Sequence, residues 1–330
     1  MFNKKMAMLY ILDILREYSD ENHPLTQKDI IDKLHSIYLI EIERKTISTT
    51  IQLLIDYGYD IIQIPTKGYY LYSREFDITE IKYLVDAIYS SKSIPGNEAK
   101  KLSKKLYSTL SRYDQKDFNY LYKSAEINRS QNTDIFLNIE LINEAIKLGK
   151  KISFDYLSYD EKGELTNRRN GYKYIVSPYF LVNNFNKYYL IANIEKFKNH
   201  NNYRLEYIRN IEILNDNIKP YKDVETMGEN FNITKYINDH VYMFGGEIIT
   251  TKIEILNKLA ISYVIDWFGN NARIYQENDK IIAEIKSNDD AFFYWALQYQ
   301  DNIKVLSPKK TVKRIISCLE ANIKKYKEQK

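Results

Sequence analysis

One short segment of the chain combines cationic, amide and hydroxyl side chains at a spacing that suits contacts with nucleic acid. In an expected helix from about Arg44 to Tyr57 these side chains occupy one edge: Arg44, Lys45, Thr46, Ser48, Thr49 and Gln52. Arginine or lysine can bond guanine, glutamine can bond adenine, and serine or threonine can bond a base edge or a phosphate. The opposite edge is apolar and is expected to face a core: Ile47, Ile51, Leu54 and Ile55. The segment therefore predicts a helix that could lie in the major groove of DNA.

Two further helices are expected before this polar helix. Apolar residues recur at helical spacing over residues 4–18, and a second helix follows the break at His23-Pro24. Thr26 and Asp29 have the spacing of an N-cap residue and of the acid that returns a hydrogen bond to it. The polar helix is thus the third helix of a helical unit.

Two short aromatic strands are expected after the polar helix. Gly58 ends the helix, and the strands lie near Asp60–Ile64 and Tyr69–Tyr72. The tight turn between them carries Lys67, which could reach a backbone phosphate. Three helices followed by two strands predict a winged helix-turn-helix over residues 1–75.

The net charge of this region argues against a simple DNA-binding surface. Residues 1–75 contain nine Lys or Arg and 11 Asp or Glu, a net charge of −2, whereas DNA-binding domains are usually basic. DNA binding therefore requires the cations to lie on one face. The alternative is an adaptor whose amphipathic helix docks a protein partner.

A second group of residues suits an anionic, aromatic ligand. Arg204 and Glu206 are two residues apart in an expected strand over Tyr203–Leu214, so they would share one face of it, opposite Tyr207. Arginine beside tyrosines can bind a nucleotide or an oligonucleotide through bidentate bonds and stacking. The alternative is a surface ion pair, worth about 0–1 kcal/mol.

The order of elements changes along the rest of the chain. Helices are expected over residues 78–91 and 98–112, and a further helix over Asp134–Gly149 has Gly149 as its C-cap. Several short strands then predict a small β-barrel. After Pro220 the order βαββαβ plus a helix predicts a ferredoxin-like domain.

These segments resemble the bacterial WYL-domain transcriptional regulators over essentially the whole chain. The Trp-Tyr-Leu triplet that names the family is Tyr188-Tyr189-Leu190 here, and Ile152–Tyr156 and Val176–Tyr179 match segments upstream of it. The family's Phe-Arg-Leu-Asp-Arg-Ile segment is Tyr203–Ile208 in this chain. The first arginine is retained as Arg204, but the second is Tyr207, which removes one cation from the family pattern.

The resemblance implies an α+β multidomain protein with four parts. These are a winged helix-turn-helix (1–75), a helical linker region (76–133), an Sm-like effector-sensing barrel (134–220) and a C-terminal ferredoxin-like WCX extension (221–330). It implies a sequence-specific regulator, usually a homodimer, that binds double-stranded DNA at a pseudo-palindromic operator. A nucleotide-type or oligonucleotide effector at the barrel would modulate this binding.

The resemblance also focuses the expected effector site on five residues. Arg204 and Arg168 are expected as anion contacts, and Tyr189 and Tyr156 as pocket walls or hydroxyl donors. Glu206 is expected to orient Arg204.

Other kinds of chemistry have little support in the sequence. None of the four histidines (His23, His35, His200 and His240) has metal-ligand spacing with another histidine or a cysteine. The phosphate-binding, dinucleotide and nucleophile motifs are absent, so an enzyme acting on nucleotides is the weaker alternative, and no cofactor or metal is expected. The single cysteine, Cys318, is expected to be buried and fits a reducing cytoplasm. No apolar run approaches 18 residues, so no membrane span is expected.

Overall fold

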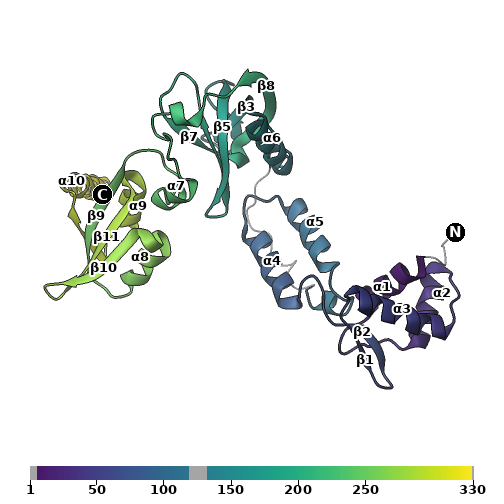
Figure 1. The fold of residues 1–330 in the computed structure, drawn as a ribbon. Coiled ribbons are helices and arrows are strands. Elements are labelled where there is room, and N and C mark those ends of the chain that lie inside the picture. Colours follow the sequence, from purple (N-terminus) through teal and green to yellow (C-terminus); the bar gives the residue numbers. More distant parts are fainter. Residues whose placement is uncertain (1–5, 119–131, 329–330) are drawn as a thin grey trace. The chain divides into compact units, whose positions relative to one another are not determined.

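The chain folds into two compact units in the structure, a computed structural model that describes residues 6–118 and 132–328 (Figure 1). The first unit is Met1–Thr133 and the second is Asp134–Lys330. Each unit combines helices with antiparallel strands, which agrees with the α+β class expected from the sequence. No helix in the described ranges has both the length and the apolar composition that a membrane span requires.

The first unit begins with three helices and a hairpin, in the order expected from the sequence. They are α1 (Ala7–Tyr18), α2 (Gln27–Tyr38), α3 (Arg44–Tyr57), β1 (Ile61–Ile64) and β2 (Gly68–Leu71). A capping box starts α2: Thr26 Oγ1 accepts from the Asp29 N–H, and the Asp29 carboxylate accepts from the Thr26 N–H. Gly58 ends α3 with a φ of 117°, a conformation that favours glycine. Apolar side chains of all five elements share one core.

The hairpin is attached to the chain just before α2. Leu25 and Tyr69 exchange two backbone hydrogen bonds, each of 2.8 Å. Beside this bridge, a Cβ atom on Gly68 would come within 2.1 Å of the Leu25 carbonyl oxygen, and the φ of Gly68 is 119°. Only glycine fits this close approach, so Gly68 holds the hairpin against the start of α2.

Two more helices complete the described part of this unit. They are α4 (Ile78–Ser90) and α5 (Gly96–Tyr107), followed by the 3₁₀ helix η2 (Asp114–Phe118). α5 ends before the expected boundary at residue 112 because the chain turns to pack on α1. The Arg74 guanidinium donates to the carbonyls of Arg16 (2.7 Å) and Ser19 (2.7 Å) near the end of α1, and to that of Thr109 (3.3 Å) after α5. Residues 119–131 of the expected linker region lie outside the described residues.

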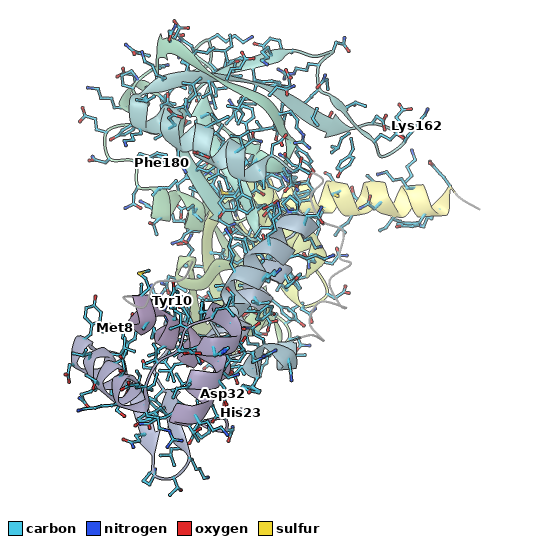
Figure 2. All side chains as sticks on the ribbon, turned by 90° about the vertical axis from the view of Figure 1, so that its right-hand side faces the viewer. Met8, Tyr10, His23, Asp32, Lys162 and Phe180 are labelled. Carbon is cyan, nitrogen blue, oxygen red and sulfur yellow. The ribbon has the colours of Figure 1, made fainter. Side chains whose placement is uncertain are left out.

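One helix and an antiparallel sheet form the first part of the second unit. The helix is α6 (Ile135–Leu148), and Gly149 is its C-cap, as expected, with a φ of 64°. The strands are β3 (Lys150–Tyr159), β4 (Leu165–Asn167), β5 (Lys173–Asn184), β6 (Lys187–Asn193), β7 (His200–Arg204) and β8 (Ile208–Asn217). Their order is β4-β3-β5-β6-β7, and β8 pairs with β3. The turn between β3 and β4 carries Lys162, whose side chain extends into solvent (Figure 2).

The continuous strand expected over Tyr203–Leu214 is wrong. β7 ends at Arg204, the 3₁₀ helix η4 (Leu205–Tyr207) follows, and β8 begins at Ile208. The chain turns here because β7 pairs with β6 whereas β8 pairs with β3. Leu205 remains fully buried at this corner. Alternation of apolar and polar residues over so few positions does not distinguish a strand from a single 3₁₀ turn.

A second, four-stranded antiparallel sheet forms the end of the chain. After η5 (Tyr221–Asp223) the elements are α7 (Ile233–Asp239), β9 (Ile248–Ile255), α8 (Ala260–Phe268), η6 (Gly269–Asn271), β10 (Ala272–Glu277), β11 (Lys280–Asn288), α9 (Asp289–Gln298), β12 (Ile303–Ser307) and α10 (Lys309–Lys327). The strand order is β10-β11-β9-β12, so one strand lies between the two strands of each β-α-β unit. The elements from β9 onward follow the expected order, whereas α7 was not expected.

The core of this last part lies between the sheet and helices α8 and α9. Its largest fully buried side chain is Trp295. The expected burial of Cys318 is wrong: this free cysteine is only partly buried in α10. Thr311 is the buried residue of that helix, and most of the helix surface faces solvent.

Candidate functional site

The six polar residues of α3 that were identified in the sequence all lie on its exposed surface. We call this set the α3 polar face: Arg44, Lys45, Thr46, Ser48, Thr49 and Gln52. Ile47, Ile51 and Leu54 are buried on the opposite side, with at most 2% of each exposed. The expected core position of Ile55 is wrong, because this side chain is 37% exposed. At 100° per residue, Ile55 lies about 80° around the helix from Ile47, at the edge of the buried stripe.

Three residues of the α3 polar face have hydrogen-bond partners within the protein. Ser48 Oγ accepts from Gln27 Nε2 at 2.5 Å, Thr49 Oγ1 donates to the Lys45 carbonyl at 3.0 Å, and Gln52 Nε2 donates to Asp56 Oδ1 at 2.9 Å. The Gln27 contact was missed in the sequence, although Gln27 directly follows the N-cap of α2. These bonds orient the polar side chains before any ligand is present.

The two cations of the α3 polar face differ from its hydrogen-bonded hydroxyl and amide groups. The side chains of Arg44 and Lys45 are exposed and form no ion pair or hydrogen bond with the described residues of the chain. Lys67, the third cation of interest, is exposed in the hairpin turn, where its N–H donates to the Ile64 carbonyl at 3.1 Å. All three positive charges are therefore available to an anionic partner.

Four of the five expected effector residues come together in the second unit. Tyr189 and Arg204 are paired across β6 and β7. The backbone N–H of Arg204 donates to the Tyr156 hydroxyl at 3.0 Å, and its guanidinium Nη2 donates to Glu206 Oε1. With Tyr207, whose ring lies 4.6 Å below the Arg204 guanidinium carbon, these residues form what we call the Arg204 cluster.

The turn explains how Arg204 reaches both Glu206 and Tyr207. Arg204 is the N-cap residue of η4, and Tyr207 is three positions later. In a 3₁₀ helix, residues three apart lie one above the other, so the guanidinium is placed over the tyrosine ring. The expected arrangement on one face of a strand is therefore wrong in its geometry, although Arg204 and Glu206 do meet. Tyr207, which was expected on the opposite strand face from Arg204, instead lies beneath its guanidinium and is a component of the cluster.

The Arg204 cluster is half-buried, and this burial changes the pKa of its tyrosines. The side chain of Arg204 is 30% exposed and that of Glu206 is 15% exposed. Burial raises the pKa of Tyr156 and of Tyr189, and the nearby Arg204 charge opposes the rise in each case. Both phenols are therefore neutral near pH 7 and can donate a hydrogen bond to a ligand.

One donor of the cluster is unsatisfied. The Arg204 Nε atom is buried and has no hydrogen-bond partner among the described residues. A buried donor without an acceptor costs about 1–3 kcal/mol, and a functional role is one of the common explanations for such a group. An acceptor atom of a bound ligand would satisfy it.

Arg168 lies at the edge of the Arg204 cluster. Its side chain is exposed after β4, and its backbone N–H donates to the Tyr156 carbonyl at 2.9 Å. Its charge also opposes the burial-induced rise in the pKa of Tyr156. The short strand β4, which pairs Leu157 with Asn167, brings Arg168 to this position and was not expected from the sequence.

A further tyrosine and a second arginine adjoin the cluster. Tyr159 is 61% exposed, and its ring meets that of Tyr207 edge-on with centroids 6.0 Å apart. Arg209 does not replace the missing cation: its guanidinium donates to the carbonyls of Glu206 (2.8 Å) and Ile208 (2.9 Å). The site thus offers one paired arginine and an aromatic surface.

Comparison with known proteins identifies one region of the chain and gives two distant structural similarities. Residues 138–213 match the WYL domain family. Proteasome accessory factor B/C (PafBC) of Arthrobacter aurescens is 15% identical, and the match covers 98% of this chain and 49% of PafBC at a TM-score of 0.30. A CRISPR Cas-related protein is 14% identical, with 96% of this chain and 98% of that chain covered at a TM-score of 0.38. A comparison with curated proteins gives no match.

The family match, and not the two structures, carries the assignment. This chain spans about half the length of PafBC, and both TM-scores are too low to support an argument about function. The matched residues run from α6 to β8 and include the whole Arg204 cluster. Residues 138–213 are therefore assigned to the WYL domain family, and the assignment extends to this region of the chain only.

Proposed function

We propose that this protein is a sequence-specific DNA-binding transcriptional regulator that is not an enzyme. In this proposal residues 1–75 form a winged helix-turn-helix, with α3 as the recognition helix and the β1–β2 hairpin as the wing. Residues 76–133 form a helical linker region. Residues 134–220 form an Sm-like barrel that senses an effector, and residues 221–330 form a ferredoxin-like WCX domain.

The observation that carries the proposal is the state of the α3 polar face. Arg44 and Lys45 are exposed and have no ion-pair partner among the described residues, and they lie next to hydroxyl and amide groups that can bond base edges. A helix that packs by its apolar side and presents unpaired cations on the other is suited to an anionic surface. The net charge of −2 over residues 1–75 does not prevent this, because three of the nine cations of this region, Arg44, Lys45 and Lys67, are exposed on α3 and in the hairpin turn.

The WYL domain supports the second half of the proposal, namely control by an effector. Arg204 and its unsatisfied Nε atom can bind an acceptor, Arg168 adds a cation at the edge, and Tyr207 and Tyr159 provide ring faces for stacking. This combination suits a nucleotide or an oligonucleotide. Such an effector changes DNA binding only if it binds the DNA-competent and DNA-incompetent states with different affinity.

We further propose that the regulator acts as a homodimer on a pseudo-palindromic operator. In a two-fold symmetric dimer the two recognition helices would meet half-sites about one DNA turn apart, or a multiple of it.

The test is fluorescence anisotropy of the full chain on DNA from upstream of its own gene, with a scrambled duplex as the control. The salt concentration is varied from about 50 to 200 mM, where a protein with 6–10 phosphate contacts loses about 10³–10⁵ in affinity. We expect binding that prefers the native duplex and weakens steeply with salt.

An adaptor whose α3 docks a protein partner is the second candidate, and the negative charge of residues 1–75 favours it. Absence of DNA affinity at every salt concentration would reject the regulator and favour this adaptor. Equal affinity for native and scrambled DNA would reject sequence recognition at that duplex.

A further inference from the structure

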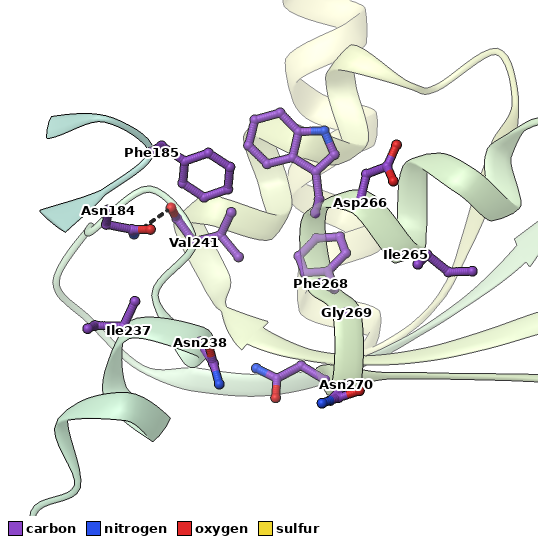
Figure 3. Close-up of a pocket in the computed structure, with 12 residues that line it drawn as sticks. Asn184, Phe185, Ile237, Asn238, Val241, Ile265, Asp266, Phe268, Gly269 and Asn270 are labelled. Carbon is purple, nitrogen blue, oxygen red and sulfur yellow. Dashed lines mark hydrogen bonds between the residues drawn. The ribbon is translucent and has the colours of Figure 1, made fainter. Parts of the chain in front are cut away.

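A cavity of about 380 Å³ lies in the second unit (Figure 3), and no residue of the Arg204 cluster lines it. Its walls come from three places: the turn between β5 and β6 with Asn184 and Phe185, the end of α7 with Ile237 and Asn238, and the segment Ile265–Asn271 at the end of α8. The volume is within the range of about 300–1,000 Å³ that is usual for small-molecule sites, and such sites often lie where substructures meet.

The formal charge on the residues that line this cavity is negative, and just outside the lining Asp239 is paired with Lys286 at 3.8 Å. Asp266 is the only ionisable residue among the described residues that line it, since the lining contains no Lys, Arg or His. Its carboxylate is exposed and forms no ion pair or hydrogen bond with the described part of the chain. α8 also ends at Phe268, next to the cavity, and the C-terminal end of a helix carries a partial negative charge. The cavity therefore repels phosphates and attracts cations.

Aromatic rings form another wall of the cavity. Phe185 stacks on Trp267 with ring centroids 5.1 Å apart and an angle of 27° between the rings. A hydrogen bond restrains the Trp267 ring, since its indole N–H donates to the Tyr299 hydroxyl at 3.2 Å. Phe185 is 54% exposed, so part of its ring is accessible to a ligand. The faces of aromatic rings attract organic cations.

Amide groups provide neutral acceptors and donors around the same space. Asn184 Nδ2 donates to the Val241 carbonyl at 3.1 Å, and Asn271 Nδ2 donates to Asp239 Oδ1 at 3.0 Å. These bonds engage at least one of the two N–H donors of each amide, and neither side-chain oxygen accepts a hydrogen bond from the described residues. The side chains of Asn238 and Asn270 have no hydrogen-bond partner in the described ranges. Figure 3 places both at one end of the cavity.

We propose that this cavity binds a small organic cation, an alkylammonium or guanidinium compound, with Asp266 as its counter-ion and Phe185 as an aromatic contact. A bare metal ion fits less well. The described residues contain no group of three His, Cys, Asp or Glu that could hold a metal, and the cavity is about ten times the volume of one water molecule in the liquid, about 30 Å³. A ligand here would contact the β5–β6 turn, α7 and α8 together.

The test is isothermal titration calorimetry of the full chain with agmatine, which carries a guanidinium and an ammonium group. Adenosine 5′-monophosphate serves as an anionic compound and adenosine as a neutral one. We expect saturable binding of agmatine at one site per chain and no binding of the monophosphate to this site.

Two variants and a matched control connect the binding to the cavity. Asp266→Asn removes the counter-ion and should weaken agmatine binding about tenfold or more. Phe185→Leu removes the ring and should weaken it about two- to fivefold. Asp279→Asn changes the net charge equally at an exposed turn outside the cavity and should leave binding unchanged. Circular dichroism confirms that each variant is folded.

Three results would overturn the proposal. These are the absence of saturable agmatine binding up to about 10 mM, an equal loss of affinity in Asp266→Asn and Asp279→Asn, and binding of adenosine in place of agmatine that Asp266→Asn leaves unchanged. The proposal is independent of the effector site, because no residue of the Arg204 cluster lines the cavity.

Discussion

The α3 polar face and the Arg204 cluster both contain arginine, but they differ in whether the cation is exposed or paired and partly buried. The cations Arg44 and Lys45 are exposed and form no ion pair within the part of the chain that the structure describes, whereas Arg204 is bonded to Glu206 and lies over Tyr207. Free surface cations give long-range attraction to phosphates, which salt weakens. A paired and partly buried arginine contributes directed hydrogen bonds and a stacking surface, and little net charge. The first site is therefore suited to a polyanion, and the second to a ligand recognised mainly by shape and stacking.

The loss of one cation at Tyr207 sharpens this difference. With Arg209 bonded to backbone carbonyls and Glu206 bonded to Arg204, Arg168 is an exposed cation at the second site that forms no ion pair with the described residues. We expect the effector to depend more on base stacking, and less on the number of phosphates, than an arginine-rich site would require.

The largest expected effect comes from removing the cations of the α3 polar face. Arg44→Ala plus Lys45→Ala should lower specific DNA affinity by about 2–6 kcal/mol, because each base contact is worth about 1–3 kcal/mol. Fluorescence anisotropy against salt checks this, and the slope with salt should also decrease. Lys100→Ala plus Lys101→Ala, on α5, removes the same charge and is the control. Equal losses in the two double variants would show that only net charge matters.

The next effect tests how the hairpin is held. Gly68→Ala places a Cβ against the Leu25 carbonyl and should destabilise the first unit by about 1–3 kcal/mol of overpacking plus about 1–2 kcal/mol of left-handed strain. Gly58→Ala is the matched control, since its φ of 117° is similar but its Cβ would meet nothing within 4 Å. Thermal unfolding followed by circular dichroism checks both variants.

The tryptophans make this experiment specific to one region. Both of them, Trp267 and Trp295, are in the second unit, so their fluorescence reports on the unfolding of that unit. Gly68→Ala should leave the fluorescence transition in place while it lowers the circular dichroism transition of the first unit. A shift of both transitions together would mean that the two regions unfold cooperatively.

The third predicted effect is a dependence of the stability of the second unit on pH. Burial, with a smaller contribution from His240, lowers the pKa of His200 from 6.5 to about 4. The folded state therefore holds the neutral imidazole, bonded to Thr226 Oγ1 (2.6 Å) and Tyr236 Oη (2.8 Å). Its contribution to stability is complete above about pH 6.5 and is lost as the pH falls toward 4, by about 2 kcal/mol between pH 7 and pH 5.

Urea unfolding followed by tryptophan fluorescence at these two pH values checks the prediction. His200→Gln cannot take up a proton in this range, so its stability should change less between the two pH values than that of the wild type. An equal change in both proteins would assign the pH dependence to other groups.

The smallest expected effect concerns the Arg204–Glu206 pair. Arg204→Ala leaves the mostly buried Glu206 carboxylate without its partner, so Arg204→Ala plus Glu206→Gln should cost about 1 kcal/mol less than the sum of the single variants. Urea unfolding of the four proteins measures this coupling. If the effects of the two single variants on the free energy of unfolding are additive, the ion pair contributes nothing to stability. We also expect the DNA affinity without effector to stay unchanged in Arg204→Ala.

The sequence was most informative where a residue acts on its neighbours in the chain. Thr26 with Asp29, Gly58 and Gly149 were identified as helix boundaries because capping bonds and positive φ angles involve residues within about four positions. The exposed positions of the α3 polar face follow from the helical period in the same way. Ile55 was misplaced because it lies at the edge of the apolar stripe, where the period alone does not decide burial.

The sequence was least informative where the chain passes from one strand pairing to another or forms a short element. The turn at Leu205–Tyr207, the short strand β4 and the helix α7 were all missed. Each is short, so its pattern of apolar residues has too few positions to indicate a period. Tyr207 was expected on the opposite strand face from Arg204 for the same reason, since its place below Arg204 depends on the 3₁₀ turn.

The amino-acid sequence by itself thus determined the order of the helices and strands in most of the chain, the exposed polar edge of α3 and the presence of a WYL domain. Only the tertiary structure decided which distant residues meet: Leu25 with Gly68, Gln27 with Ser48, and Tyr156 with Arg204. Local patterns reflect hydrogen bonds and burial along one element. Contacts between elements depend on how strands pair and turn, and this information is spread over the whole fold.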